Sequence, residues 1–252
     1  MTLPAYRITA ATGLDQGDRE YQQDQLSLQS HPRHASCLLG VVADGMGGRS
    51  GGRKAADQVL MTAQQLFERF DPASDDPSAF LLRVANEAHT VIRLTAASAE
   101  EEPHSTIAAF LLLPGGECHW VHSGDSRLYH FRDDKLVQRT RDHSYVQALV
   151  DRGELSEEEA ADDPRSNVLL HCLGTETDPV LSQRSLGKLL PGDVIVACSD
   201  GVWHHISTAE LGLVAGQLAP RPACELLVKR SRERARGRGD NLSLIVLKLE
   251  AL

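Results

Sequence analysis

An apolar run that ends in an acidic, glycine-rich turn is the feature that most constrains this chain. The run covers residues 37–42, and Ala43-Asp44-Gly45-Met46-Gly47-Gly48 follows it at once. A short, continuous apolar run is typical of a strand that is buried in a sheet. Because glycine has no side chain, the backbone after Asp44 can approach a bound group closely. The pattern therefore places one carboxylate at the end of a rigid, buried strand.

Two other interpretations of this stretch stay open at this point. An Asp-Gly pair after a strand is most often a simple turn, since both residues tolerate unusual backbone angles. A phosphate-binding loop is the second alternative, because residues 47–54 are rich in glycine and basic residues. The P-loop, however, requires Lys and then Ser or Thr directly after its last glycine. Here Arg53, Lys54 and Ala55 follow Gly52, so the sequence does not favour a nucleotide-binding loop.

The order of the expected elements indicates the fold class. Apolar runs and alternating patterns predict strands at residues 6–12, 25–29, 37–43, 106–113, 118–122, 126–131, 135–139, 180–186, 194–198 and 242–249. Helical periodicity predicts helices at 55–70, 78–97, 145–152, 155–161, 208–217 and 222–236. Strands and helices in separate groups are typical of α+β proteins, whereas a parallel βαβ sheet would alternate throughout. We therefore expect antiparallel sheets packed face to face, with helices outside.

Four more aspartates lie at the ends of expected strands. Asp200 closes the apolar run 194–199 and is followed by glycine, as Asp44 is. Asp24 and Asp240 stand just before strands, and Asp125 follows one. One such aspartate is a turn residue, but five at the edges of strong strands predict a cluster. Since like charges repel, such a cluster needs cations to hold it together.

The donor atoms in this cluster select the cation. All candidates are oxygen ligands, and no Cys or His stands at metal-binding spacing. Oxygen-rich sites that retain waters suit Mg²⁺ or Mn²⁺. Two such ions about 3.5–4 Å apart acidify a water and clamp a phosphoryl group for in-line attack. Arg19 offers a bidentate contact for the phosphate, although a lone arginine is more often a solvated surface residue.

Composition excludes several classes of protein. The 252 residues carry 26 Lys and Arg against 35 Asp and Glu, and this net charge of −9 argues against nucleic-acid binding. The five cysteines contain no CxxC pair, so we expect reduced, buried thiols in a cytoplasmic protein. No apolar run is long enough to span a membrane, and the first residues lack a signal-peptide pattern. We expect a monomer that binds neither nucleic acid nor membrane.

Seven short motifs carry these positions in a fixed order along nearly the whole chain. They are Gly17-Asp18-Arg19 with Asp24, Asp44-Gly45-Met46-Gly47-Gly48, His104-Ser105-Thr106, Gly124-Asp125-Ser126-Arg127, Asp142-His143-Ser144, Ser199-Asp200-Gly201-Val202-Trp203 and Gly239-Asp240-Asn241. Taken together, the series resembles the type 2C serine/threonine phosphatases, a family of metal-dependent protein phosphatases, in their compact bacterial form. The resemblance implies one domain over residues 1–252. Its fold would be a four-layer α-β-β-α sandwich, with two antiparallel sheets flanked by helix pairs and a flap at about 143–173.

The same resemblance implies the metal ligands. Asp44 would bridge two ions, Mn²⁺ or Mg²⁺, and the carbonyl of Gly45 would bind one of them. Asp200 and Asp240 would bind the other ion. Asp125 would help to bind a weaker third ion.

The resemblance also implies the reaction, the hydrolysis of phosphoserine and phosphothreonine in proteins by direct attack of a metal-activated water. Arg19 would hold the substrate phosphate, Asp24 would hydrogen-bond the waters of the metal pair, and Asp44 would complete the catalytic set. The implied partners are phosphorylated proteins, including a bacterial serine/threonine kinase or its substrates, with type VI secretion control as one such setting.

Three residues depart from the family pattern. Gln23 stands where Glu is usual, and an amide cannot add negative charge to support a metal pair. His204 stands where many members carry an Asp that joins the third ion. Its expected role is packing, with a titratable group near the site as the alternative. Met46 replaces a histidine that some relatives carry as a candidate general acid.

Alternative functions stay open at this stage. Gln23 and His204 are compatible with a phosphoprotein-binding module that turns over little substrate. A partner-switching phosphatase is a third option, although the fused sensor domains that often mark that class are missing from the sequence. A run of basic residues lies at Lys229, Arg230, Arg232, Arg234, Arg236 and Arg238. We expect a solvated helix face there, with a docking surface for an acidic partner as the alternative.

Overall fold

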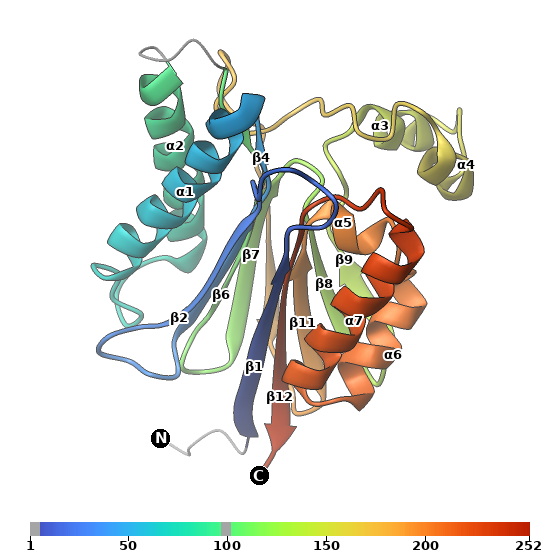
Figure 1. The fold of residues 1–252 in the computed structure, drawn as a ribbon. Coiled ribbons are helices and arrows are strands. Elements are labelled where there is room, and N and C mark those ends of the chain that lie inside the picture. The colour runs from blue at the N-terminus through green and yellow to red at the C-terminus, as the bar shows by residue number, and fades with distance from the viewer. Residues whose placement is uncertain (1–5, 97–101) are drawn as a thin grey trace.

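Two antiparallel five-stranded sheets pack face to face in the computed structural model, which describes residues 6–96 and 102–252, without the side chains at 49, 50 and 162 (Figure 1). The first sheet has the order β1 (Tyr6–Asp15), β12 (Leu242–Ala251), β11 (Asp193–Cys198), β8 (Arg127–Arg132) and β9 (Lys135–Arg139). The second has the order β10 (Ser182–Lys188), β7 (Glu117–Ser123), β6 (Ile107–Leu112), β3 (Leu38–Ala43) and β2 (Gln25–Ser30). A two-stranded ribbon joins β4 (Gly45–Met46) to β5 (His104–Ser105).

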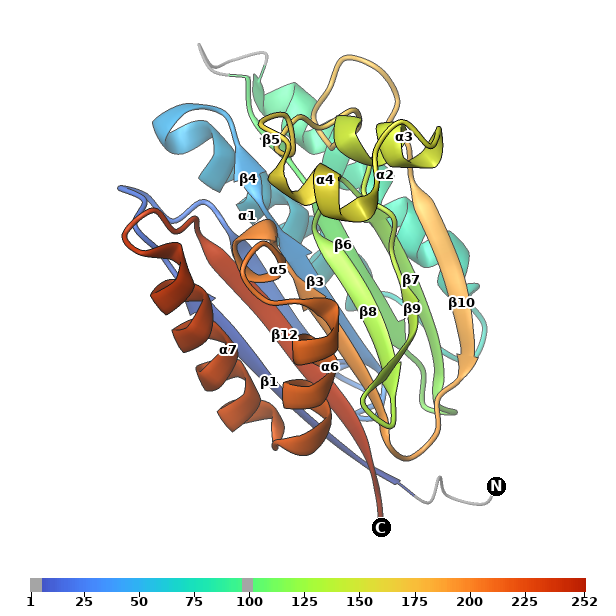
Figure 2. The same ribbon diagram turned by 90° about the vertical axis from the view of Figure 1, so that its right-hand side faces the viewer.

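Helix pairs cover the outer face of each sheet. The second sheet carries α1 (Gly48–Phe67) and α2 (Pro77–Ala96), and the first carries α6 (Thr208–Gln217) and α7 (Pro220–Ala235). Three short helices, α3 (Tyr145–Asp151), α4 (Glu157–Asp162) and α5 (Asp200–Trp203), lie at one end of the sandwich (Figure 2). The expected four-layer α-β-β-α arrangement is confirmed. None of the described helices is both long and apolar enough to cross a membrane.

The core consists of three apolar layers, and strand alternation explains how one strand serves two of them. On β3, Leu39 and Val41 face α1 and α2, whereas Leu38 and Val42 face the other sheet. Successive side chains of a strand point to opposite faces, so a strand covered on both sides must be apolar throughout. This is why residues 37–42 form an uninterrupted apolar run.

The structure differs from the expected elements mainly at short or glycine-rich segments. Helix α1 begins at Gly48 rather than near residue 55, after Gly47 takes a positive φ of 114°. The ribbon β4–β5 and helix α5 were not predicted, because elements of two to four residues show no periodicity. The end of the helix predicted over 78–97 reaches beyond the described residues. All five cysteines are free and buried, as expected.

Most of the basic residues on α7 are paired within the chain. Arg230 and Arg234 both bind Glu210 of α6, at 2.7 and 2.6 Å. Arg232 contacts the carboxylate of Asp18 at 3.0 Å. These ion pairs tie α7 to its neighbours, which favours the interpretation of this run as a helix face rather than a docking surface.

The inter-sheet layer supplies a test of packing at Gly40. A Cβ atom on Gly40 would lie 2.3 Å from the ring of Phe110, its partner on β6. We expect Gly40→Ala to lower the free energy of unfolding by about 1–3 kcal/mol, measured by urea denaturation. The double variant Gly40→Ala/Phe110→Leu should recover part of that loss. Gly115→Ala is the control, since nothing lies within 4 Å of a Cβ there; equal losses at both glycines would contradict the packing account.

Candidate active site

The strand register brings the five aspartates to the same end of the sandwich. In the second sheet, Gln25 pairs with Ala43, so Asp24 and Asp44 follow as neighbours at the ends of adjacent strands. In the first sheet, the end of β11 lies between the starts of β8 and β12. Asp125, Asp200 and Asp240 lie next to these three strand ends. Because neighbouring strands are antiparallel, the end of one strand always meets the start of the next.

Two serine hydroxyls join the two halves of the cluster. Ser199 and Ser243, both from the first sheet, donate hydrogen bonds of 2.6 and 2.8 Å to Oδ2 of Asp24. Asp24 belongs to the second sheet and is only 1% exposed. Sequence reasoning missed both serines. The signal was present, since Ser243 interrupts the otherwise apolar run of β12 and Ser199 precedes Asp200.

Burial and mutual repulsion shift the protonation of the cluster. Burial raises the pKa of Asp24 to about 6 and that of Asp125 to about 7. The pKa of Asp44 lies well above its usual range because of burial and the surrounding carboxylates, all four of which contribute. Burial and neighbouring carboxylates raise the pKa of Asp200 in the same way. Full ionisation of these four carboxyl groups is therefore unfavourable unless a cation offsets their charge, because solvent cannot screen it.

Arg19 lies at the mouth of the cluster, where the sequence predicted a phosphate ligand. Its Nη2 contacts Oδ2 of Asp240 at 2.5 Å, and its side chain is 62% exposed. That contact raises the pKa of Arg19, with further contributions from the charges of Asp200 and Asp44. The guanidinium is thus within electrostatic reach of the carboxylates and remains accessible to a ligand.

Asn241 holds the loop that carries Arg19. Its Nδ2 donates to the carbonyls of Gln16 and Tyr21, and its Oδ1 accepts from the backbone N–H of Gln23 at 2.7 Å. Asp18 strengthens the same attachment by accepting from the backbone N–H of Gly239 at 2.7 Å. These contacts place the loop against the start of β12, and sequence reasoning assigned no role to Asn241.

Backbone contacts explain two residues beside Asp44. A Cβ on Gly45 would lie 2.0 Å from the carbonyl oxygen of Gly52, so only glycine fits there. Gln23 donates from Nε2 to the carbonyl of Gly48 at 2.8 Å, at the start of α1. A glutamate at position 23 would lack this donor. The glutamine that departs from the family pattern therefore has a structural role, which is to hold the start of α1. Asp44 itself is held through its N–H, which donates to Oγ1 of Thr106 at 2.9 Å.

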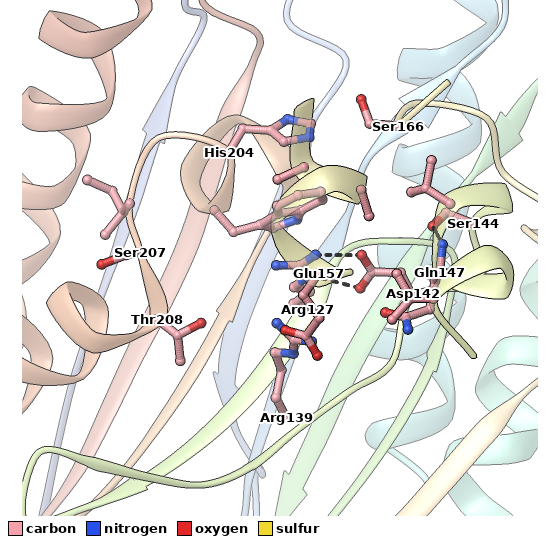
Figure 3. Close-up of a pocket in the computed structure, with 16 residues that line it drawn as sticks. Arg127, Arg139, Asp142, Ser144, Gln147, Glu157, Ser166, His204, Ser207 and Thr208 are labelled. Carbon is pink, nitrogen blue, oxygen red and sulfur yellow. Dashed lines mark hydrogen bonds and ion pairs between the residues drawn. The ribbon is translucent and has the colours of Figure 1, made fainter. Parts of the chain in front are cut away.

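A stacked network supports the loop of Asp125. Trp203 donates from Nε1 to the carbonyl oxygen of Asp125 at 3.0 Å. Arg127 lies over the Trp203 ring at 3.5 Å and binds Asp142 through two hydrogen bonds of 2.9 and 2.7 Å (Figure 3). His204 is the next residue, with Nδ1 3.7 Å from Oδ2 of Asp200. Burial and the charge of Arg127 lower the pKa of His204 to about 4, so it is neutral near pH 7 and packing is its better-supported role.

Helices α3 and α4 border a cavity of about 250 Å³ next to this network (Figure 3). Gln147 and Glu157 line it from α3 and α4, and Trp203 and His204 line it from the opposite side. Arg139 of β9 also reaches the cavity wall. The cavity is a recess between the short helices and the network of Arg127 and Trp203, and Trp203 in turn holds the carbonyl oxygen of Asp125.

The donor chemistry of the cluster fits hard cations. Its side chains offer carboxylate oxygens only, and the positive charges that act on them come from Arg19 at the mouth and from Arg127 near Asp125. Within the described part of the chain, no three His, Cys, Asp or Glu side chains already form a set that could hold an ion. Asp240 is engaged by Arg19, and unscreened carboxylates repel one another, so the ligand set would have to close around the cation.

Comparison with known proteins identifies the family. The sequence model of protein phosphatase 2C matches residues 16–221. The chain belongs to the protein phosphatase 2C family. The serine/threonine protein phosphatase PstP of Mycobacterium tuberculosis is 34% identical over 179 residues, which cover 69% of this chain and 33% of PstP. The match thus spans about a third of the length of that relative.

Solved structures of the protein phosphatase 2C family share the same fold. The catalytic domain of PstP in complex with two manganese ions matches with a TM-score of 0.82 at 26% identity, over 96% of this chain and 98% of that one. PppA, described as a regulatory component of the type VI secretion system in Pseudomonas aeruginosa, gives a TM-score of 0.78 at 28% identity. That match covers 98% of this chain and 99% of PppA. The resemblance inferred from the seven motifs is confirmed.

Because the carboxylates repel one another, the free energy of unfolding should depend on pH. Asp44 has a folded-state pKa well above its unfolded value of about 3.9, so its stabilising contribution is present at low pH and is lost as pH rises. In EDTA, Asp44→Asn should therefore become more stable relative to the natural protein between pH 5 and pH 7, by about 1–2 kcal/mol.

Chemical denaturation at pH 5, 6 and 7 measures this difference. The comparison at each pH cancels buried histidines such as His143 and His204, whose lowered pKa values act in both proteins. Excess Mn²⁺ should stabilise the natural protein and leave Asp44→Asn nearly unchanged. A difference that shrinks from pH 5 to pH 7 would refute the repulsion.

Proposed function

We propose that this chain is a metal-dependent serine/threonine phosphatase, which hydrolyses phosphoserine and phosphothreonine in proteins. The observation that carries the proposal is the convergence of five aspartates from both sheets on one end of the sandwich, with Arg19 exposed at its mouth. Membership of the protein phosphatase 2C family supports the same reaction. The name of PstP and the two manganese ions in its structure support the metal dependence.

The proposed metal ligands come from four strand ends. Asp44 and the carbonyl of Gly45 would hold one ion, and Asp44, Asp200 and Asp240 the other. Asp125 would contribute to a weaker third site, where His204 offers no carboxylate. When bound, Mn²⁺ or Mg²⁺ would supply an acidified water and positive charge that stabilises the phosphoryl oxygens.

The chain's own residues would position the substrate. Arg19 can exchange its contact with Asp240 for the oxygens of a phosphate, since a guanidinium binds both groups with the same donors. Asp24 would orient water next to the phosphorus, because Ser199 and Ser243 fix its carboxyl group. Neither residue needs a covalent bond to the substrate, which is consistent with direct attack by water.

We propose residues 1–252 as a single domain in which residues 143–173 form a flap over the site. Backbone hydrogen bonds of 2.8 Å close the base of this segment, from Tyr145 to the carbonyl of Val168 and from Leu170 to the carbonyl of His143. Serine caps define both of its helices, Ser144 for α3 and Ser156 for α4. The flap thus has a fixed stem and borders the recess that Trp203 and His204 line from the other side.

The proposed partners are phosphorylated proteins, including a bacterial serine/threonine kinase or its substrates. The similarity to PppA supports a setting in the control of type VI secretion. The acidic composition supports a protein that does not bind nucleic acid, and the free, buried cysteines support a cytoplasmic location. A monomer that does not bind membranes completes the proposal. The alternative function is a phosphoprotein-binding module with little turnover. Gln23 and His204, which differ from the family pattern, are compatible with it.

Turnover of p-nitrophenyl phosphate tests the function. We expect hydrolysis with Mn²⁺, loss of activity in EDTA and recovery when Mn²⁺ is restored in excess. Arg19→Ala should lower kcat/KM by about 10- to 100-fold, because the phosphate loses a charged donor. Arg7→Ala is the matched control, since Arg7 is also an exposed arginine with one carboxylate partner, Glu250.

The same assay separates the two functions. No Mn²⁺-dependent turnover, together with retained binding of a phosphoserine peptide, would establish the binding module instead. Equal losses in Arg19→Ala and Arg7→Ala would remove the role assigned to Arg19.

A further inference from the structure

A second cavity opens between the edge strands of the two sheets, below the flap. Strands β9 and β10 lie at the same side of the sandwich, one at the edge of each sheet (Figure 2). The cavity between them measures about 350 Å³. We call it the edge groove, and it is lined by Trp120, His122, Val137, Gln138, Arg139, Thr140, Arg141, Ser182, Gln183 and Arg184.

Strand register explains how side chains of both sheets meet in the edge groove. Trp120 belongs to the inter-sheet layer, and Arg184 is its cross-strand partner on β10. Cross-strand partners point to the same face of a sheet, so Arg184 lies at the mouth of that layer. Trp120 is 3% exposed and forms the floor, whereas Val137 on β9 is 53% exposed at the rim. The groove therefore has an apolar floor and a charged wall.

The charge of the edge groove is opposite to that of the protein as a whole. Three arginines line it, and none of its lining residues is acidic. Arg139 and Arg141 face carboxylates of the flap, with Arg139 3.6 Å from Glu157. Arg184 has no ion pair with a carboxylate in the described ranges 6–96 and 102–252. In a chain of net charge −9, this is a local site for an acidic ligand.

The backbone of both walls is also available. Strand β9 pairs only with β8, and β10 pairs only with β7, so among the described strands their outer edges are free. An extended peptide can hydrogen-bond such an edge, with its alternate side chains directed into the adjoining groove. This geometry suits an extended segment better than a helix.

The edge groove adjoins the recess beneath the flap. Arg139 lines both the edge groove and the recess beneath the flap. Arg141 directly precedes Asp142, whose carboxylate holds the Arg127 side chain stacked on Trp203. The groove is thereby connected, through Arg141 and Asp142, to the network in which Trp203 holds the carbonyl oxygen of Asp125.

We propose that the edge groove binds an acidic, extended segment of the phosphoprotein substrate, at a distance in sequence from the phosphorylated residue. The identity of the partner rests on the proposed function, but binding of the acidic segment does not. Arg184 would be the main charged contact, with Trp120 and Val137 receiving an apolar side chain of the peptide.

Fluorescence anisotropy with a labelled peptide tests this proposal. The probe is an unphosphorylated dodecapeptide rich in Asp and Glu with one central Leu, measured in EDTA so that metal ions cannot hold it. We expect binding at low salt that weakens as salt is added. Arg184→Gln should weaken it by about tenfold, a loss of about 1.4 kcal/mol, and Arg184→Lys should retain part of it. Arg69→Gln, the same charge change at an exposed position just after α1 and outside the lining of the groove, should have no effect.

Val137→Glu is a second variant that places a carboxylate at the exposed rim, and it should abolish peptide binding without disturbing the core. The same affinity in the natural protein, Arg184→Gln and Arg69→Gln would overturn the proposal, as would no binding at low salt. Loss of a dimer in Arg184→Gln, seen by sedimentation, would show instead that a second copy occupies the groove.

Turnover of p-nitrophenyl phosphate distinguishes failure of the docking site from failure of the proposed phosphatase activity. This small substrate does not reach the edge groove, so Arg184→Gln and Val137→Glu should retain the activity of the natural protein. Peptide binding without turnover would leave the docking site standing and refute the phosphatase. Turnover without peptide binding would refute the docking site and leave the phosphatase standing.

Discussion

The unfavourable burial of several carboxylates in one place is the constraint on which the rest of the structure depends. Asp24 and Asp125 are almost inaccessible to solvent, and the pKa values of Asp44 and Asp200 are raised well above the usual range. No apolar core gains stability from such a cluster, and each ionised member raises the cost of the next. The fold tolerates this arrangement only because rigid strand ends deliver the side chains, and its stability is therefore linked to the ions that neutralise it.

The two sheets have to remain in one relative position for this cluster to exist. Most of the inter-sheet contact is apolar and nondirectional, through residues such as Phe110 and Leu247. The hydroxyls of Ser199 and Ser243 are directional, and both meet the same oxygen of Asp24. They set the register of one sheet against the other at the end where the aspartates meet. The apolar layer supplies stability, and these few polar contacts supply alignment.

Much of this site could be predicted from the sequence, because aspartates next to apolar strands mark the ends of those strands. Antiparallel pairing then requires Asp24 to meet Asp44, whatever the details of packing. The supporting residues could not be found in this way. Asn241 and Trp203 act through hydrogen bonds with residues 78 or more positions away, and such pairings depend on how the two sheets pack. The edge groove was missed for the same reason, since it belongs to no single segment.

The ion pair between Arg19 and Asp240 joins two residues for which we propose different ligands. In the roles proposed above, one partner is an anion receptor and the other a cation receptor, and each blocks the other while they remain together. A cation bound to Asp240 would offset the negative charge that holds Arg19, so the guanidinium would be freer to bind a phosphate. Cation binding and phosphate binding would thus favour each other, and inhibition by inorganic phosphate, the reaction product, would strengthen as the concentration of divalent cation rises.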